Sequence, residues 1–229
     1  MALESDLGPF RGFGPDAPTF YVDLEANNSR AWFDEHRDVY EEQVRRPMEQ
    51  LLADVAEEFG DHAKVFRPNR DIRFSKDKSP YKLHCGAVVG DGAPGSPVYY
   101  AHVSADGLLA ASGYHRMSRD QVERFLAAVD DDVTGPELEA LVAAARDDGA
   151  TVGGSELKTS PRGYPNDHPR VELLRHKGLT LSRSWAPFKW LQTREALVRI
   201  TDLWHETAPI NAWLTTNVGA AREQRSGRP

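Results

Sequence analysis

The stretch "PVYYAHVSADGLLAASGY", residues 97–114, is the strongest indication of the fold of this chain. Two runs of aromatic, β-branched and small residues flank a dipeptide, Asp106–Gly107, that is typical of a two-residue type I′ hairpin loop. The stretch therefore predicts two antiparallel strands, with His102 opposite Ala111. One face of this hairpin would carry Tyr100, His102, Ala111, Gly113 and His115.

Two further strand-like runs precede the hairpin, "VFRPNRDIRF" at 65–74 and "CGAVV" at 85–89. The glycine-rich "GDGAPGS" at 90–96 has no lysine and no strand-to-helix context, so we interpret it as a hairpin loop rather than a phosphate-binding loop. These four runs predict a mainly antiparallel sheet in the middle of the chain.

Helical patterns lie on both sides of the strands. Asn27 or Asn28 can cap a helix over 29–46, and a second helix over 47–60 would end at Gly60. The second helix has a predicted buried stripe of Met48, Leu51, Leu52, Val55 and Phe59.

After the strands, two capping-box patterns open helices over 118–132 and 134–148. A short helix capped by Asp167 and a helical pair over 193–217, broken near Pro209, complete the chain. The capping boxes pair Ser118 with Gln121 and Thr134 with Glu137. The order of elements predicts an α+β fold with one domain over 19–217, an irregular lead-in over 1–18 and a polar tail over 218–229.

Composition limits the class of protein. The 229 residues contain 40% hydrophobic and 28% charged residues and a single cysteine, Cys85, which cannot form an internal disulfide. No run of eighteen apolar residues occurs, and the first residues lack the pattern of a secretory signal. We expect a cytoplasmic protein that does not interact with membranes.

The charge is unevenly distributed along the chain. The first basic segment, residues 67–84, has six basic and two acidic residues, and so has the second basic segment, residues 158–183. Each carries a net +4, so the rest of the chain carries −15 of the total −7. The two segments either converge on one anionic ligand or are solvated surfaces paired with nearby acids. This overall acidity is not typical of a general duplex-DNA binder.

The first basic segment contains the strongest candidates for anion binding. If "DIRFS" (71–75) is a strand, Ile72 and Phe74 point to the core and Arg73 projects from the other face beside Asp71. An arginine fixed in this way suits bidentate recognition of a carboxylate or phosphate. The alternative is an ion pair between Arg73 and Asp71, which would contribute under about 1 kcal/mol. Further candidates for the ligand site are Arg70, Lys76, Lys78, Tyr81 and Lys82.

The second basic segment contributes Arg162 and Arg175 to the predicted ligand site. Arg162 lies in the loop "PRGYPNDHP", which glycine and prolines constrain. The dipole and cap of a helix already account for cations in "RHKG" at 175–178. His84 and His168 are the candidates for a general acid or base, because histidine titrates near neutrality. We assign no reaction, because no nucleophile–base pair is visible.

We expect neither a cofactor nor a metal. The dinucleotide fingerprint, the Walker-type phosphate loop and the H-E-x-x-H pattern do not occur in the sequence. His102 and His115 would lie roughly 13 Å apart along the predicted hairpin, too far for both to bind one zinc ion directly. Cys85, within an apolar run, is expected to be a small buried side chain.

Two long motifs resemble a known family. "RDIRFSKDKSPYKLHCGA" at 70–87 and "SPRGYPNDHPRVELLRHKGL" at 160–179 are similar to those of the conserved hypothetical family called domain of unknown function 2461. The segments at 27–52 and 209–214 resemble its opening and its closing helix. The resemblance covers roughly residues 18–216 and implies a single domain, but it implies no activity.

Three functions remain open from the sequence. The first is a cationic site for a small anionic ligand, such as one that carries phosphate. The second is a binder of single-stranded nucleic acid or RNA, which would use the basic segments together with Tyr81 and Tyr164. The third is a module that docks an acidic partner without catalysis.

Overall fold

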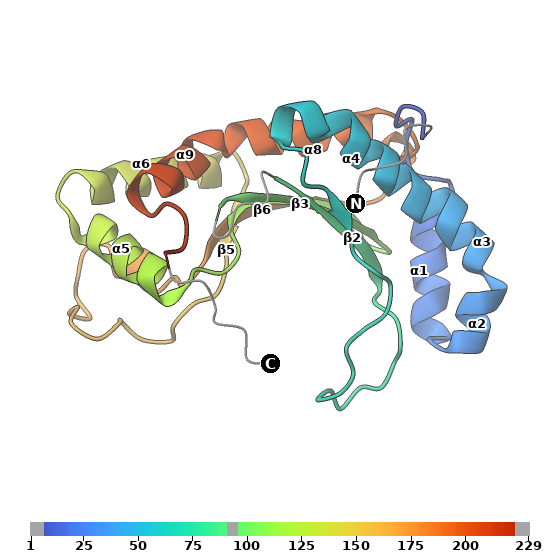
Figure 1. Ribbon diagram of the computed structural model, residues 1–229, viewed down its shortest axis with the longest axis horizontal. Helices are drawn as coiled ribbons and strands as arrows, with labels where there is room; N and C mark the ends of the chain where they lie inside the picture. The colour runs from blue at the N-terminus through green and yellow to red at the C-terminus, as the bar shows by residue number, and fades with distance from the viewer. Residues whose placement is uncertain (1–6, 91–95, 223–229) are drawn as a thin grey trace. The chain divides into compact units, whose positions relative to one another are not determined.

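The computed structural model describes residues 7–90 and 96–222. Along the chain, helices α1 to α4 come first and strands β1 to β4 follow. Helices α5 and α6 then precede β5, α7 lies between β5 and β6, and α8 and α9 come last (Figure 1). The sheet has the strand order β1-β2-β3-β4-β6-β5. This arrangement confirms the predicted α+β class and the mainly antiparallel sheet in the middle of the chain.

The strands are β1 (Lys64–Val65), β2 (His84–Val89), β3 (Val98–Ser104), β4 (Gly107–Tyr114), β5 (Thr151–Gly153) and β6 (Leu179–Trp185). The two edge pairs are antiparallel: Val65 lies opposite Ala87, and Val152 lies opposite Leu181. The predicted loop over 90–96 falls almost wholly on residues 91–95, which lie outside the described residues.

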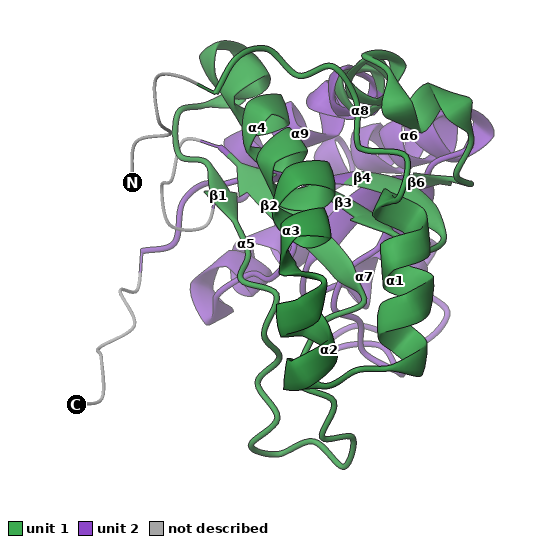
Figure 2. Ribbon diagram, turned by 90° about the vertical axis from the view of Figure 1, so that its right-hand side faces the viewer, with its two compact units in different colours: residues 1–89, 100–110, 184–202 green, residues 90–99, 111–183, 203–229 purple. Residues whose placement is uncertain are grey.

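The chain divides into two compact units, each described by itself (Figure 2). Unit 1 comprises residues 1–89, 100–110 and 184–202, and unit 2 comprises residues 90–99, 111–183 and 203–229. Strands β3, β4 and β6 each contain residues of both units. The single domain over 19–217 stays a prediction.

Unit 1 begins with α1 (Ala17–Ala26), α2 (Arg30–Glu35), α3 (Arg37–Tyr40), one turn of π-helix, η1 (Glu41–Arg45), and α4 (Arg46–Phe59). The predicted stripe on α4 is confirmed, because all five of its residues are buried and α4 packs against β2. Gly60 follows α4 with a φ of +110°, a conformation that favours glycine. The cap of α2 is Ser29, whose hydroxyl accepts a hydrogen bond from the Trp32 amide; neither Asn27 nor Asn28 fills this position.

Unit 2 contains α5 (Arg119–Asp130), α6 (Thr134–Asp147), α7 (Val171–Leu174) and α9 (Ala208–Asn217). The capping box of Ser118 with Gln121 is confirmed at the start of α5. The edge of the Phe125 ring meets the Trp213 ring, with centroids 6.2 Å apart, and the Trp213 indole donates to the carbonyl of Thr134. The short 3₁₀ helix η2 (Lys189–Gln192) and helix α8 (Glu195–Glu206) precede α9, and Pro209 lies in the first turn of α9, which confirms the expected break near it.

The hairpin between β3 and β4 is confirmed, but its turn differs from the prediction. A type I′ loop at Asp106–Gly107 needs a positive φ at both residues, and no described residue other than glycine has one. The turn residues are Ala105 and Asp106, and β4 begins at Gly107 with a φ of +107°. A Cβ atom on Gly107 would lie 2.2 Å from the carbonyl oxygen of Trp185, so close approach of the backbone also requires glycine there.

In the described residues, no helix is both long enough and apolar enough to cross a bilayer. The cytoplasmic location stays a prediction.

Candidate functional site

The first basic segment forms a long loop between β1 and β2 rather than a strand. Its one ladder contact is an isolated bridge between Asn69 and Tyr81. The expectation that Ile72 and Phe74 point to the core is wrong, because the Phe74 side chain is 96% exposed and residues 73–74 form a turn. The alternation of polar and apolar residues over 71–75 predicts a strand, but short polar side chains here form hydrogen bonds with the local backbone, and these compete with strand pairing.

The base of this loop is fixed to the helices of unit 1. The Asn28 side chain donates to the carbonyl of Tyr81 at 3.0 Å and accepts from the Tyr81 amide at 3.1 Å. The Tyr81 ring is 5% exposed and stacks on Phe33 with centroids 4.0 Å apart. Tyr81, a predicted ligand residue, therefore anchors the loop through both its ring and its backbone.

The arginines at the tip of the loop are paired with acids of the same loop. Arg73 contacts Asp71 at 2.6 Å, and this hydrogen bond lowers the pKa of Asp71 to about 2. Arg70 forms an ion pair with Asp77. Because these pairs are largely exposed, they add little stability, but they neutralise much of the positive charge that the sequence places there.

The two lysines of the tip differ in their contacts. Lys78 donates from Nζ to the carbonyl of Ile72 at 3.0 Å, so its amine helps to fold the loop. Lys76 is exposed. The ligand role of Arg70, Arg73, Lys76 and Lys78 stays a prediction.

The second basic segment lies in unit 2, so the structure describes it separately from the first. Arg175 pairs with Glu172 at 2.9 Å, and Arg183 pairs with Glu206 at 2.8 Å. Arg162 is exposed. The ligand role of Arg162 and Arg175 stays a prediction.

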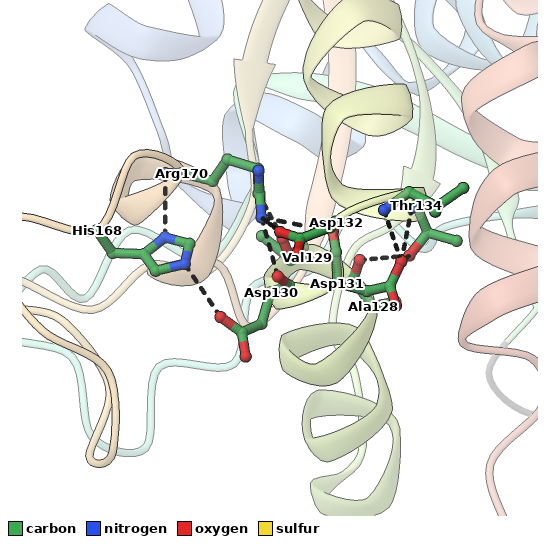
Figure 3. Close-up of polar contacts among 9 residues, drawn as sticks. Ala128, Val129, Asp130, Asp131, Asp132, Thr134, His168 and Arg170 are labelled. Atoms are coloured by element: carbon green, nitrogen blue, oxygen red, sulfur yellow. Dashed lines mark hydrogen bonds and ion pairs between the residues drawn. The ribbon is translucent and has the colours of Figure 1, made fainter.

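Arg170 and His168 fix the corner between α5 and α6 (Figure 3). The Arg170 side chain, 9% exposed, donates to the carbonyls of Val129 at 2.7 Å and Asp130 at 2.9 Å, at the end of α5. His168 accepts from the Arg170 amide at Nδ1 and contacts a carboxylate oxygen of Asp130 through Nε2, each at 3.0 Å. Both ring nitrogens are thus engaged by the protein, which supports a structural role for His168; its catalytic role stays a prediction.

Two predicted helix caps at this corner are wrong. The start of α6 is capped by Asp131 rather than Thr134: its carboxylate accepts from the amides of Val133 and Thr134 at 2.8 and 2.9 Å (Figure 3). Asp167 does not cap α7, which begins at Val171. Just before this helix, the amide of Arg170 donates to the ring of His168. In both cases a neighbouring side chain with equally suitable spacing makes the contact.

A second group of cations lies at the base of the loop, close to where β1 ends and β2 begins. We call Lys64, Arg67 and Lys82 the cation cluster. In residues 7–90 and 96–222, none of the three forms an ion pair with a carboxylate. The Lys64 and Lys82 amines lie 5.9 and 5.6 Å from the centroid of the Phe66 ring. Burial and the charges of Arg67 and Lys64 lower the pKa of Lys82, as expected where like charges gather.

Four rings adjoin the cation cluster in unit 1, and we call Phe66, His84, Tyr100 and His102 the ring patch. Along β2, Cys85, Ala87 and Val89 are buried, whereas His84 is half-buried on the other face. On β3, Ala101 and Val103 are buried, and Tyr100 and His102 are half-buried. Strand alternation therefore places these histidines and Tyr100 on the face of the sheet opposite α4.

The rings of the patch contact one another. The centroids of His84 and His102 are 5.0 Å apart, those of Tyr100 and His102 are 5.6 Å apart, and those of Phe66 and Tyr100 are 6.5 Å apart. The Tyr100 hydroxyl lies 3.1 Å from Nδ1 of His102. Gly86 lies beneath Tyr100: a Cβ atom there would be 2.6 Å from the Tyr100 hydroxyl oxygen.

Burial sets the protonation of the patch. It lowers the pKa of His84, assisted by the charge of Lys82, and with His84 it lowers the pKa of His102 to about 4. Burial raises the pKa of Tyr100 to about 12. At neutral pH both imidazoles are therefore uncharged and the phenol keeps its proton.

Cys85 lies on the opposite face of β2 and is 1% exposed, which confirms that it is a small buried side chain. Burial raises the pKa of its thiol to about 12, so the described structure provides no thiolate nucleophile there at neutral pH. Among the described residues, no three His, Cys, Asp or Glu side chains gather as they would around a metal ion.

Sequence reasoning located Lys82 and His84 but missed their partners. Lys64, Phe66, Tyr100 and His102 come from β1, from the residue after it and from β3, and strand pairing brings them to the end of the basic segment. The period-2 pattern of "YYAHVS" carries the signal for Tyr100 and His102, since it places both on one face.

The fold defines an α+β protein with one six-stranded sheet and helices at both ends of the chain. The chain belongs to the family described as "Conserved hypothetical protein (DUF2461)", whose model matches residues 16–213. This match confirms the resemblance drawn from the two long motifs. No curated protein and no solved structure matches the chain.

Proposed function

We propose that unit 1 binds a small anionic ligand, one that carries phosphate, at the cation cluster. The observation that supports this most is the absence of a carboxylate partner for Lys64, Arg67 and Lys82 within the described residues. The charges of Arg67 and Lys64 repel that of Lys82, Asp71 attracts Arg67 without an ion pair, and a bound anion would relieve the repulsion at Lys82. Arg70 and Arg73 are paired already, so an anion at those residues would have to compete with Asp77 and Asp71.

Hydrogen-bond donors complement the charge. Lys82 donates one N–H to the carbonyl of Arg67 at 2.8 Å, which orients the amine and leaves two further N–H groups for a ligand. His84 is half-buried beside Lys82, and its neutral imidazole carries one N–H that can donate to a phosphate oxygen. Charge and directed donors together suit phosphate, whose oxygens accept several hydrogen bonds at once.

The site is proposed for binding, and we assign it no reaction. His84 remains the candidate for a general base, because its lowered pKa keeps it unprotonated at neutral pH. Arg162 and Arg175 belong to unit 2, and the proposed site does not depend on them.

The experiment is calorimetric titration of the full chain with inorganic phosphate and pyrophosphate at low and at physiological salt. We expect both to bind, pyrophosphate more tightly, and Lys82→Gln to weaken the affinity at least tenfold. The matched control is Arg73→Gln, which removes a paired cation of the same segment and should change affinity less than twofold. Undetectable binding to the wild-type protein at millimolar concentration, or equal loss in both variants, would refute the proposal.

A second candidate function, docking of an acidic partner, is favoured by one observation. Phe74 is 96% exposed at the tip of a loop that also carries Lys76, an exposed cation that forms no ion pair within the described part of the chain. Phe74→Ser separates the two functions, because it removes the anchor and leaves the cation cluster intact. If anion binding falls together with the Phe74 side chain, the two surfaces are not independent.

A further inference from the structure

The ring patch and the cation cluster meet at Phe66. Both lysine amines lie within 6 Å of the Phe66 centroid, and the centroids of Phe66 and Tyr100 are 6.5 Å apart. From Tyr100 the contacts continue through His102 to His84. Charge for an anion and a continuous aromatic surface are therefore adjacent in one compact unit.

The patch is built as a surface on the sheet. The absence of a side chain on Gly86 allows Tyr100 to lie across β2, because any Cβ atom there would collide with the Tyr100 ring. Each of the four rings is half-buried, so its edge or face is supported by its neighbours while part of it stays in contact with solvent. Rings held in this way lose little conformational entropy when a second planar group stacks on them.

We infer that the ligand of this site is a phosphorylated compound with a planar heteroaromatic ring, of the nucleoside monophosphate class. Its phosphate would lie on the cation cluster and its ring on the patch formed by Tyr100, His102 and His84. This inference rests on the proposed function, since the cation cluster supplies the phosphate contact. Aromatic side chains beside cations are the combination by which proteins hold a base and its phosphate.

A single nucleotide fits the charges better than a nucleic-acid strand. Lys64 and Lys82 meet at one ring and the charge of Arg67 acts on Lys82, which suits a single phosphate group, whereas a strand needs positive charge along a groove. Residues outside the two basic segments carry a net −15, which opposes a polyanion. The base would meet two uncharged imidazoles; Nδ1 of His102 is already engaged by the Tyr100 hydroxyl, which leaves Nε2 of His102 and the nitrogens of His84 for polar contacts with a ligand.

The experiment titrates the full chain with five probes: inorganic phosphate, ribose 5-phosphate, a purine nucleoside monophosphate, a pyrimidine nucleoside monophosphate and an eight-nucleotide single strand. We expect at least one nucleoside monophosphate to bind tenfold or more tightly than ribose 5-phosphate, since stacking on an aromatic side chain is worth at least a few-fold in affinity. Tyr100→Leu should abolish that advantage, and Tyr100→Phe should retain it because the ring remains.

His84→Leu is the second variant, in case Tyr100→Leu fails to fold, and it should likewise reduce the preference for nucleotides over ribose 5-phosphate. Phe188→Leu is the matched control, because Phe188 is an exposed aromatic residue of unit 1 outside the patch. It should leave every affinity within twofold.

The outcomes separate the inference from the proposed function. If phosphate and ribose 5-phosphate bind but the nucleotides bind no more tightly, the inference is overturned and the anion site stands. If no probe binds, both fail. If the strand binds far more tightly than the mononucleotides and loses affinity steeply with salt, a nucleic-acid ligand replaces the mononucleotide.

Discussion

The protonation of His102 gives the sharpest test of the ring patch. Burial and the neighbouring His84 lower the pKa of His102 from 6.5 to about 4 in the folded protein, and Asp106 opposes this only weakly. A histidine with a lowered pKa stabilises the fold fully above about pH 6.5, because neither state is then protonated. As the pH falls towards 4, the unfolded chain takes up a proton that the folded protein does not, and stability is lost.

The magnitude follows from the two pKa values. A difference between 6.5 and about 4 corresponds to on the order of 3 kcal/mol at 1.36 kcal/mol per pH unit. The hydrogen bond with Tyr100 acts in the same direction. Tyr100 keeps its proton, because its pKa is about 12, and its hydroxyl can donate to an unprotonated Nδ1 of His102. Protonation of His102 removes that acceptor.

Two measurements check this prediction. The pKa of His102 is read from the chemical shifts of its ring in an NMR titration, and urea unfolding at pH 7, 6, 5 and 4.5 gives the free energy of unfolding. His102→Gln should unfold with a shallower dependence on pH between 6.5 and 4.5, because it lacks the titrating group. The carboxylates whose pKa values are lowered, such as Asp71 and Asp120, are common to both proteins and cancel in the difference. A His102 pKa of 6 or above, or parallel stability curves, would refute the reasoning.

Three further predictions concern the fold. Asn28→Ala should destabilise unit 1 by about 1–3 kcal/mol in urea unfolding, since it leaves the Tyr81 amide and carbonyl without their partner; Asn27→Ala, in which the lost contact is with the exposed Asp23 carbonyl, should cost less. Arg170→Leu should lower the free energy of unfolding by about 2–4 kcal/mol, because the carbonyls at the end of α5 lose their buried donor. Arg162→Leu, at an exposed position, should change it by no more than about 0.5 kcal/mol, and equal losses in the two variants would contradict the capping role of Arg170. Phe74→Ser should leave the thermal midpoint within about 1 °C, and a clear fall would show that Phe74 packs against the protein.

The sequence predicted elements wherever one periodic pattern dominated. The stripe on α4 was predicted residue by residue, because fourteen residues of period 3.6 admit one solution. The prediction from sequence was wrong where two local conformations compete. Ile72 and Phe74 alternate as in a strand, but the carboxylates of Asp71 and Asp77 accept from nearby backbone amides and stabilise a loop. Thr134 has the spacing of a cap, and so has Asp131, whose carboxylate accepts more strongly than a hydroxyl.

For the site, the sequence located an excess of charge but not its compensation. Arg73 and Lys82 have the same sign and lie nine positions apart, yet Arg73 is paired with a carboxylate and Lys82 is paired with none among residues 7–90 and 96–222. Whether a cation meets an acid depends on the path of the loop and on β1, whose Lys64 joins Lys82 at the Phe66 ring. No periodicity encodes such a meeting.

Because the two units alternate along the chain, they cannot be separated by truncation of the protein or by recombination of its gene. Each unit is assembled from three separate stretches of chain, and the chain passes between the units directly after β2 and inside β3, β4, β6 and α8. No single deletion from either terminus removes one unit and spares the other. A truncated gene therefore cannot encode unit 1, which contains the cation cluster, without part of unit 2. Recombination between genes cannot transfer one unit as a continuous cassette either. The ring patch of unit 1 and the corner capped by Arg170 in unit 2 are therefore inherited together, because the stretches of chain that form the two units alternate in one gene.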